Sequence, residues 1–384
     1  MRACFSPDFN LGILGGGQLG KMLIQPAHTW NMSTRVLDPA SNAPARNLCT
    51  EFFLGSLTEH NTVLEFGRDA DLLTIEIENV CSEALQQLKS EGVTVHPDPE
   101  KLKIIQDKGL QKEFFDAHGL PTARFELFEG IDKVHEAMQD GRWSIPFVQK
   151  FRTGGYDGRG VFVIRTQDDI EKMRDVPCVI EEFVPLVKEL SVIAARSPSG
   201  ETRCFPAVEL EFHPDANLVE NLLCPADLAP GIAEEALRIA ECTIDAFDLC
   251  GLLAVEMFLK EDGGIEINEV APRPHNSGHH TIESCYTSQY EQHLRAILDL
   301  PLGSTELKAC AVMVNLLGEE GYRGTPLYEG VEKCLALDGS HIHIYGKKET
   351  RDFRKMGHVT LISDTLESAR EKAAFIKKNL RVIT

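Results

Sequence analysis

Residues 265–280 combine carboxylates, two amides, an arginine and three histidines, which are side chains that hold cations and phosphate groups. The first part of this stretch alternates β-branched and polar residues, which predicts a strand, and Pro272 and Pro274 then end any regular element. Residues 252–259 predict a partner strand, joined to the first by the glycine-containing turn 260–264. Because a hairpin that opens into a polar loop is a rigid frame for a site, we expect the chemistry of the protein here.

The predicted hairpin carries three carboxylates, Glu256, Glu266 and Glu269. Two of them could hold Mg²⁺, which prefers oxygen ligands and usually keeps phosphate or water in the rest of its shell. Charged residues on hairpins more often simply face water. Glu256 differs, because it lies inside the apolar run 252–259, and a buried carboxylate needs a partner. The hairpin alone leaves both a metal or phosphate site and a solvated surface open.

A glycine-rich turn follows the first predicted strand. Gly15, Gly17 and Gly20 fit the spacing of a dinucleotide-binding turn, and Asp38 lies about where such folds place an acidic residue. A nicotinamide-dependent oxidoreductase is therefore one hypothesis. Similar turns also bind other phosphates at helix N-termini, or only pack a strand against a helix.

A second glycine-rich segment follows a predicted strand that ends at Lys150. Residues 154–160 contain four glycines, with Arg152 and Arg159 nearby. Backbone N–H groups in such a loop can approach phosphates closely, and guanidinium groups bind oxygens in pairs. We therefore favour a phosphate-binding loop over a plain hairpin turn. Residues 346–355 add a loop with five cations, which favours an anionic substrate over solvated charge.

Strands and helices alternate through the first hundred residues and predict an open α/β sheet, whose ligands lie beyond the carboxyl ends of the strands. Glu76 and Asn79, near the end of a strand predicted at 71–80, could meet the same ligand as the first glycine turn, or only face solvent. We expect helices at 82–91, 100–118, 231–247, 288–298 and 365–379. We expect further strands at 93–95, 145–150, 177–184, 189–195, 309–316, 341–345 and 358–362.

The bulk composition describes a globular protein of two or three domains. Its 384 residues carry a net charge of −20, which argues against binding to nucleic acid or to a membrane surface. No stretch approaches the roughly 20 apolar residues of a membrane helix, and residues 1–10 lack the apolar run of a signal peptide. The eleven cysteines show no paired spacing, so we expect free thiols and a cytoplasmic location.

Taken together, five segments resemble the ATP-grasp superfamily and, within it, the N5-carboxyaminoimidazole ribonucleotide synthetase family. The segments are 15–22, 74–80, 152–160, 268–279, and 345–347 with 354–358. The resemblance implies an ATP-grasp fold of mixed α/β and α+β class. It implies a Rossmann-like N-terminal domain (1–104), an ATP-grasp domain of two subdomains (105–302, divided near 185) and a small, mostly β C-terminal domain (303–384). It also implies a homodimer.

The resemblance assigns roles to individual residues. ATP would bind between the two subdomains, with Mg²⁺ held by Glu256 and Glu269; Glu266 and Asn268 offer a competing metal register. The ATP-binding set would be Lys108, Lys150, Gly155, Gly158, Gly160, Glu181, Glu182, Val184, Glu189 and Asn268. The substrate-binding set would be Gly17, Gln18, Leu19, Glu76, Asn276, Ser277, Lys347 and Arg354. The catalytic set would be Tyr156, Asp157, Arg159, Arg273 and His275.

The family reaction implied is the ATP- and bicarbonate-dependent carboxylation of 5-aminoimidazole ribonucleotide in purine biosynthesis, through carboxyphosphate. Asp157 and His275 are candidates for a base, and neither is singled out. Arg351, Arg354 and Lys355 all remain candidates to contact the substrate phosphate. The alternatives are another ATP-grasp purine ligase, such as the formate-dependent glycinamide ribonucleotide transformylase, the nicotinamide oxidoreductase, or a non-catalytic nucleotide-binding module.

Overall fold

The computed structural model describes residues 4–155, 160–212 and 218–384. The chain begins with a parallel sheet of five strands in the order β3-β2-β1-β4-β5. Its strands are β1 (Asn10–Leu14), β2 (Ser33–Asp38), β3 (Glu51–Leu54), β4 (Leu72–Ile75) and β5 (Thr94–Val95). Its helices are α1 (Gln18–Thr29), α2 (His60–Gly67) and α3 (Ser82–Ser90). The predicted alternation of strands and helices is thereby confirmed.

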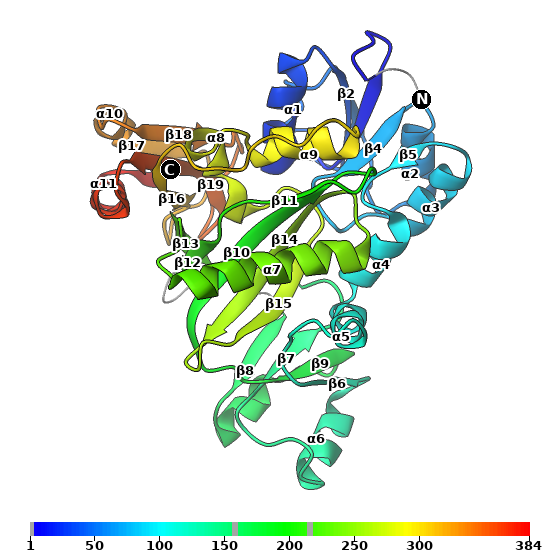
Figure 1. Ribbon diagram of the computed structural model, residues 1–384, viewed down its shortest axis with the longest axis vertical. Helices are drawn as coiled ribbons and strands as arrows, with labels where there is room; N and C mark the ends of the chain where they lie inside the picture. The colour runs from blue at the N-terminus through cyan, green and yellow to red at the C-terminus, as the bar shows by residue number, and fades with distance from the viewer. Residues whose placement is uncertain (1–3, 156–159, 213–217) are drawn as a thin grey trace.

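A smaller antiparallel sheet of four strands follows, in the order β6-β9-β7-β8. It lies with α6 at the lower end of the molecule in Figure 1. Its strands are β6 (Phe125–Phe128), β7 (Phe147–Phe151), β8 (Val161–Ile164) and β9 (Cys178–Glu182). The helices of this part are α4 (Pro99–Gln106), α5 (Lys108–Ala117), α6 (Ile131–Gln139) and the short 3₁₀ helix η1 (Gln167–Lys172).

The largest sheet has nine strands and runs β15-β14-β10-β12-β13-β16-β19-β18, with β11 paired to β10. Its first members are β10 (Leu186–Arg196), β11 (Thr202–Cys204), β12 (Val208–Phe212), β13 (Val219–Cys224), β14 (Gly251–Lys260) and β15 (Ile265–Ala271). β16 (Cys310–Leu317), β18 (Ser340–Ile344) and β19 (Lys355–Ser363) extend the same sheet, so the C-terminal strands continue it by hydrogen bonding.

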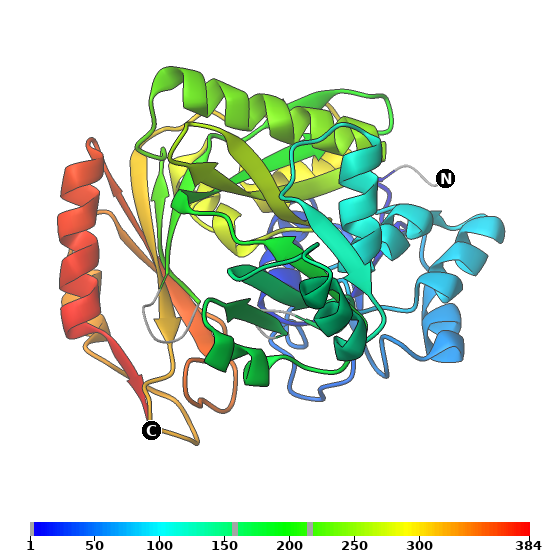
Figure 2. The same cartoon turned by 90° about the horizontal axis from the view of Figure 1, so that it is seen from below.

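Helices cover this sheet on different sides. α7 (Pro230–Phe247) buries its apolar face against β10, β14 and β15. α11 (Leu366–Asn379) packs on β16 and β19, on the outer side of the C-terminal strands (Figure 2). The C-terminal part also holds α10 (Val331–Leu335) and the strand pair β17 (Leu327–Glu329) and β20 (Arg381–Ile383).

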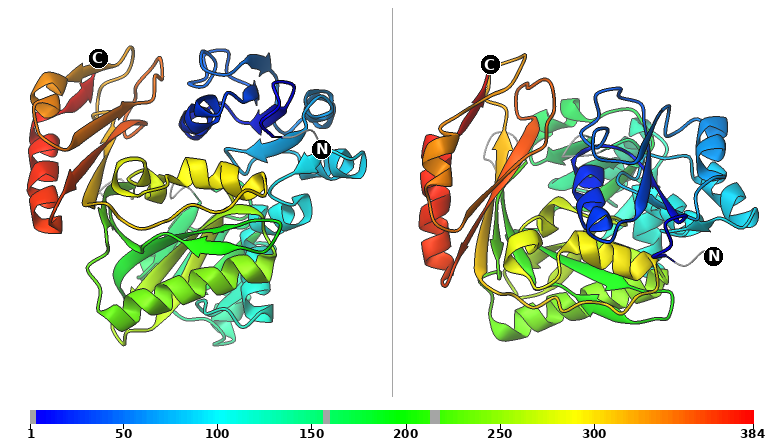
Figure 3. Two further views of the ribbon diagram at one scale, coloured as in Figure 1. Left: turned by 45° about the horizontal axis from the view of Figure 1, so that its top comes forward. Right: turned by 90° about the horizontal axis from the view of Figure 1, so that it is seen from above.

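Helix α9 (Gln289–Ile297) joins the N-terminal sheet to the large sheet. Its Tyr290 and Leu294 pack with residues of β1, β2 and α1, whereas Ala296 packs with Ile193 and Leu252 of the large sheet. The left view of Figure 3 shows α9 between the two layers. The turn η2 (Asn276–Gly278) and α8 (Thr281–Ser284) precede it, so the loop with most of the candidate chemistry lies where these layers meet.

The sequence prediction was wrong in two places. The helix expected over 100–118 is two helices, because Asp107 is extended (φ −116°, ψ 112°) between α4 and α5. The strand expected at 71–80 ends at Ile75, and residues 76–79 form a turn. Both breaks place charged side chains at the end of an element, where they contact distant parts of the chain.

Candidate active site

The hairpin β14–β15 places Glu256 directly opposite Glu269. Val255 and Met257 point to the core under α7, so Glu256 lies on the other face of the sheet. The register shifts after this pair, and Asn268 is the extra residue of a β-bulge on β15. Because a bulge re-aims side chains, Asn268 and Glu269 can both serve the face that carries Glu256.

Lysines from the four-stranded sheet and from α5 meet this face. Lys150 at the end of β7 donates to Asn268 Oδ1 (2.7 Å) and pairs with Glu181 Oε2 of β9 (2.9 Å). Lys108, the first residue of α5, pairs with Glu269. These contacts join the small sheet, α5 and the large sheet. We call the residues that meet here the charged cluster: Lys108, Lys150, Glu181, Glu256, Asn268 and Glu269.

A third lysine, Lys112, lies beneath this cluster. Its ammonium is 3.3 Å from Glu181 Oε2 and donates to Thr122 Oγ1 (2.7 Å). The side chains of Lys112 and Glu181 are 2% and 3% exposed, so this pair is a buried one. Lys112 was not among the predicted site residues; only its spacing of four from Lys108, which gives both side chains the same face of α5, could have indicated it.

Burial dominates the electrostatics of the cluster. It lowers the pKa of Lys108 to about 8, with Lys150 adding to the effect, and lowers the pKa of Lys112 to about 8. Burial also acts to raise the pKa of Glu181, but Lys150 and Lys112 outweigh it and leave that pKa below its ordinary value. The result is a carboxylate kept ionised between ammonium groups, which suits a site for a polyanion.

Two further carboxylates on the same face of the large sheet have raised pKa values. Burial raises the pKa of Glu256, against the opposing effects of Lys108, Lys355 and Arg273. Burial, together with the charge of Glu256, raises the pKa of Glu189 to about 7. Ionised carboxylates that repel one another and are partly shielded from water are stabilised when a cation or a hydrogen-bond donor binds to them.

Asp107 and Arg152 tie the start of the second glycine-rich segment to α5. The Arg152 guanidinium contacts both Asp107 oxygens (3.0, 3.1 and 2.8 Å), and the backbone N–H of Lys108 donates to the Arg152 carbonyl (2.8 Å). Asp107 also accepts from the N–H groups of Gly109 and Leu110, capping α5. Arg152, expected beside a phosphate, is therefore engaged in holding Lys108 in place.

The loop after β15 contacts the N-terminal part of the chain and two regions of the large sheet. Arg273 pairs with Glu78, which follows β4 of the N-terminal sheet (2.8 Å). His275 Nε2 lies 3.4 Å from Glu256 Oε1. The Asn276 amide exchanges hydrogen bonds with the Asn315 amide of β16 (3.0 and 3.1 Å). Arg273 and His275 thus join the charged cluster, whereas the amide of Asn276 anchors the loop to the C-terminal strands.

The backbone N–H groups of the first glycine turn are already hydrogen-bonded to carboxylate side chains of the protein. Both oxygens of the buried Glu76 accept backbone N–H groups, from Gly17 and Gly20 (2.8 Å each), and Asp38 accepts from Gly16 (2.7 Å). These are the groups that would hold a dinucleotide pyrophosphate and ribose. The carboxylate of Glu76 takes the place of that anion, which argues against the nicotinamide hypothesis. Gln18 and Leu19 open α1 at this turn.

The cationic loop of the C-terminal part folds partly on itself. Lys347 donates to the Lys355 carbonyl (2.7 Å) and lies over the Tyr345 ring, while Arg354 donates to the Glu349 carbonyl (2.7 Å). Lys355 itself lies close enough to Glu256 to lower the pKa of that carboxylate. Of the three cations left open by the sequence, the structure thus brings Lys355 to the charged cluster.

A cavity of about 360 Å³ lies between the 182–185 connection and the end of the β14–β15 hairpin. Glu182 and Val184, predicted to bind ATP, line it together with Lys260 and Glu266. Glu266, one half of the competing metal register, pairs with Lys260 (2.8 Å). Its position at the cavity, and not at the cluster, favours Glu256 with Glu269 as the cation-binding pair.

The described residues supply only part of the ligand shell that Mg²⁺ needs. No group of three or more His, Cys, Asp or Glu in the described ranges could hold a metal ion. The facing pair Glu256 and Glu269 offers two carboxylates, and Mg²⁺ commonly takes its remaining ligands from substrate phosphates and water. The donor set therefore fits Mg²⁺ that arrives with a nucleotide.

Several predicted residues cannot be placed. Tyr156, Asp157, Gly158 and Arg159 lie outside the described residues, and Gly155 and Gly160 flank them. Conversely, Asp107, Lys112 and Glu78 belong to the site contacts but were not predicted to do so. Within the described ranges, no helix is long and apolar enough to cross a membrane.

Comparisons with known proteins agree with this arrangement. Three family models match successive parts of the chain: a ribonucleotide synthetase preATP-grasp domain (9–106), an ATP-grasp domain (113–290) and a phosphoribosylaminoimidazole carboxylase C-terminal domain (311–372). The phosphoribosylaminoimidazole carboxylase of Vigna aconitifolia chloroplasts is 38% identical over 95% of this chain, which spans 66% of that relative's length.

Shorter relatives match over nearly their whole length. The N5-carboxyaminoimidazole ribonucleotide synthase of Bacillus subtilis is 37% identical, covering 93% of this chain and 92% of the relative. The crystal structure of the Thermotoga maritima synthetase is 42% identical (TM-score 0.90; 98% and 99% of the two chains). An Aspergillus clavatus synthase in complex with ADP and 5-aminoimidazole ribonucleotide is 32% identical (TM-score 0.89; 97% and 99%). The chain therefore belongs to the N5-carboxyaminoimidazole ribonucleotide synthase family of ATP-grasp ligases.

Proposed function

We propose that this protein uses ATP and bicarbonate to carboxylate the exocyclic amine of 5-aminoimidazole ribonucleotide. The observation that supports it most is the charged cluster, in which Lys108 and Lys150 meet Glu256, Asn268 and Glu269 from a different sheet. This combination of lysines with facing carboxylates suits a nucleotide triphosphate that carries Mg²⁺. The family's carboxylating activity supplies the identity of the second substrate.

On the ATP side, the adenine would enter the 360 Å³ cavity beside Glu182 and Val184. Glu189 would accept from the ribose, because it lies on β10 on the face that carries Glu256. Lys108 and Lys150 would bind the phosphates, with Glu181 holding Lys150 in place. Magnesium held by Glu256 and Glu269 would supply neutralisation of the charge on the phosphates.

On the substrate side, Arg273, His275 and Lys355 converge on Glu256 from the loop after β15 and from β19. Lys347 and Arg354 would bind the ribonucleotide phosphate, and Glu76 would hold the first glycine turn that forms the opposite wall. Tyr156, Asp157 and Arg159 are proposed for the same place on the strength of the family motif alone. Lys21 of α1 donates to the Ile344 carbonyl (2.9 Å), so the N-terminal and C-terminal walls are joined.

The reaction proceeds in two balanced steps. A bicarbonate oxygen attacks the γ-phosphorus of ATP, which breaks the bond to ADP and gives carboxyphosphate. The substrate amine then attacks the carbon of carboxyphosphate and forms the carbon–nitrogen bond, and phosphate leaves with the carbon–oxygen electron pair and takes up the proton that the amine loses. Lysine side chains oppose the charge that develops in the first step, and a closed site keeps water from carboxyphosphate in the second.

The test is ADP release with Mg-ATP and bicarbonate, with and without 5-aminoimidazole ribonucleotide. We expect release that depends on the ribonucleotide and that matches the loss of its free amine. Release stimulated instead by formate and glycinamide ribonucleotide would identify the transformylase. Release without any stimulation by either nucleotide would contradict the assignment of substrate while leaving ATP binding in place.

Assembly and location complete the proposal. We propose that the protein is a cytoplasmic homodimer that binds neither nucleic acid nor membranes, and that its three domains divide near residues 104 and 302. The family resemblance supports the dimer, and the net charge of −20 supports the absence of nucleic-acid binding. Light scattering at two protein concentrations tests the dimer, and a mass of one chain at both would contradict it.

A further inference from the structure

His275 is held in place through its backbone. The buried Gln289 side chain accepts from the His275 N–H (2.8 Å) and donates to the His275 carbonyl (2.7 Å). Gln289 is fully buried, and a Cβ at Gly278 would overlap its side chain, so the turn after His275 packs closely on it. This double hydrogen bond leaves the imidazole ring only its side-chain torsions to adjust.

One face of the ring is contacted by Ser277. The Ser277 backbone N–H donates to His275 Nδ1 (3.3 Å), and the Ser277 hydroxyl lies 2.8 Å from the same nitrogen. A backbone N–H can only donate, so Nδ1 must present its lone pair. In the neutral ring the proton is therefore on Nε2, which is the nitrogen that lies 3.4 Å from Glu256.

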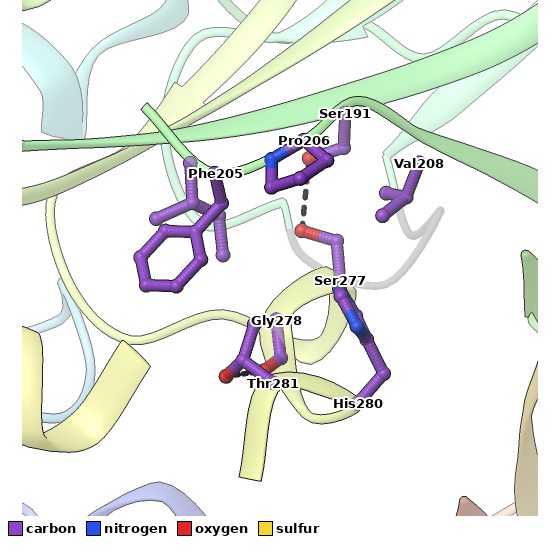
Figure 4. A pocket seen from close by; sticks show the side chains of 9 residues that line it. Ser191, Phe205, Pro206, Val208, Ser277, Gly278, His280 and Thr281 are labelled. Atoms are coloured by element: carbon purple, nitrogen blue, oxygen red, sulfur yellow. Dashed lines mark hydrogen bonds between the residues drawn. The ribbon is translucent and has the colours of Figure 1, made fainter. Parts of the chain in front are cut away.

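The hydroxyl groups of Ser191 and Ser277 donate hydrogen bonds in a single order that ends at His275. Because Nδ1 accepts, the Ser277 O–H also donates to it and shares its single lone pair with the backbone N–H, and the Ser277 oxygen is then free to accept from Ser191 Oγ (2.8 Å). Figure 4 shows these two hydroxyls pointing toward each other between β10 and η2. The described residues that line this pocket leave no room for a water molecule beside the two hydroxyls.

This series of contacts begins and ends on neighbouring strands of the large sheet. Ser191 of β10 is the cross-strand partner of Glu256 of β14, so both side chains lie on the same face as neighbours. The loop bridges them, from Ser191 through Ser277 and His275 to Glu256. Ser191 and Ser277 are 1% and 2% exposed, so the contacts that orient His275 lie in the protein interior and its Nε2 faces the site.

We propose that Ser191 and Ser277 are positioning residues that hold His275 as the neutral tautomer protonated on Nε2. His275 thereby offers Glu256 a hydrogen-bond donor and orients that carboxylate for its cation; it is not the base that removes a proton from the substrate amine. The inference rests on the proposed function for the identity of the site, but the tautomer of His275 does not depend on which substrate the protein uses. This role is separate from the predicted contact of Ser277 with the substrate.

The tautomer can be measured directly. We expect long-range ¹H–¹⁵N spectra of the histidine-labelled, full-length protein to show His275, assigned by loss of its signals in His275→Gln, with a protonated Nε2 and an unprotonated Nδ1. A ring protonated on Nδ1, or an equal mixture of tautomers, would overturn the proposal. This result does not depend on activity, so a confirmed tautomer without ribonucleotide-stimulated ADP release would overturn the proposed function and leave the inference standing.

Variants test the role. We expect Ser277→Ala to lower kcat for ADP release about tenfold, with the KM for ATP changed less than threefold and a mixed tautomer in the spectrum; Ser191→Ala should follow more weakly. Ser284→Ala is the matched control, since it removes an equally buried hydroxyl that lies 2.8 Å from His280 Nδ1 in the same region. Equal losses of kcat in Ser277→Ala and Ser284→Ala would show that packing alone is involved and would overturn the proposal.

A replacement of the ring separates donor from base. His275→Gln can place an amide N–H near the position of Nε2, whereas His275→Asn places one near Nδ1. We expect the glutamine variant to keep at least tenfold more activity than the asparagine variant. Equal activities, or a more active asparagine variant, would contradict a donor at Nε2.

Discussion

Replacement of Asp107 tests how the break between α4 and α5 serves ATP binding. The Asp107 carboxylate caps α5 at Gly109 and Leu110 and forms a two-pronged pair with Arg152. A helix N-cap contributes about 1 kcal/mol. A half-buried, bidentate ion pair contributes about 1 kcal/mol more. Asp107→Ala loses both and so loosens the start of α5, where Lys108 lies, by about 2 kcal/mol.

If all of that free energy appears in ATP binding, the Kd for Mg-ATP rises about 30-fold, because each 1.4 kcal/mol is about tenfold. Asp107→Asn keeps an oxygen that can cap α5 but loses the charge that holds Arg152. We therefore expect a rise of about fivefold for the asparagine variant, from about 1 kcal/mol. The effect on the ribonucleotide should be smaller, since the contact chain from Asp107 leads to Lys108 and to the glycine-rich segment.

Titration calorimetry with Mg-ATP on wild type, Asp107→Asn and Asp107→Ala measures this series. Glu235→Ala is the control, because it removes an exposed ion pair with Arg238 on α7 (2.7 Å), away from the charged cluster. We expect the control to bind ATP as wild type does. A folded Asp107→Ala protein whose Kd for Mg-ATP stays within twofold of wild type would refute the reasoning, and equal effects of the two Asp107 variants would show that the cap adds nothing beyond the ion pair.

Three further changes have defined outcomes. Glu269→Gln should abolish ADP release while the thermal unfolding curve stays close to that of wild type, because one carboxylate charge of the proposed cation pair is lost; near-normal release would reject Glu269 as a metal ligand. Lys347→Ala should raise the KM for 5-aminoimidazole ribonucleotide at least tenfold more than the KM for ATP, and equal effects would show that the C-terminal loop is wrongly assigned. Glu189, whose pKa is raised from 4.5 to about 7 by burial and by Glu256, keeps in the folded state a proton that the unfolded chain releases. Its contribution to stability is complete below pH 4.5 and is lost as the pH rises through 7. Between pH 5 and pH 8 the melting temperature of Glu189→Gln should therefore fall less than that of wild type. Parallel plots of melting temperature against pH for the two proteins would contradict the raised pKa.

Much of the fold could be predicted because its signals are local. The hairpin β14–β15 follows from an apolar run and an alternating segment on the two sides of a glycine-containing turn, and the structure confirms it at 251–260 and 265–271. The amphipathic helix expected at 231–247 is α7 (Pro230–Phe247). Turns, alternation and helical periodicity depend on neighbours within a few residues, so the sequence carries them without the rest of the chain.

Only some members of the charged cluster, and none of its pairings, were predictable from the sequence. The sequence indicated Lys150, Glu256 and Glu269 because carboxylates and a lysine end or interrupt apolar strands. It left Lys355 open beside Arg351 and Arg354, because five cations share that loop and nothing local separates them. It did not single out Lys112, since the partner that buries it, Glu181, lies on a strand far along the chain.

The sequence by itself determined the order of the motifs, the local elements and the set of charged residues that ATP-grasp chemistry needs. The tertiary structure alone decided where a helix ends and what each charge contacts. Asp107 breaks the predicted helix because Arg152, 45 residues away, holds its carboxylate, and Glu76 closes a glycine turn 59 residues before it. Such contacts are set by how the sheets pack together, and no spacing within one segment of the chain records them.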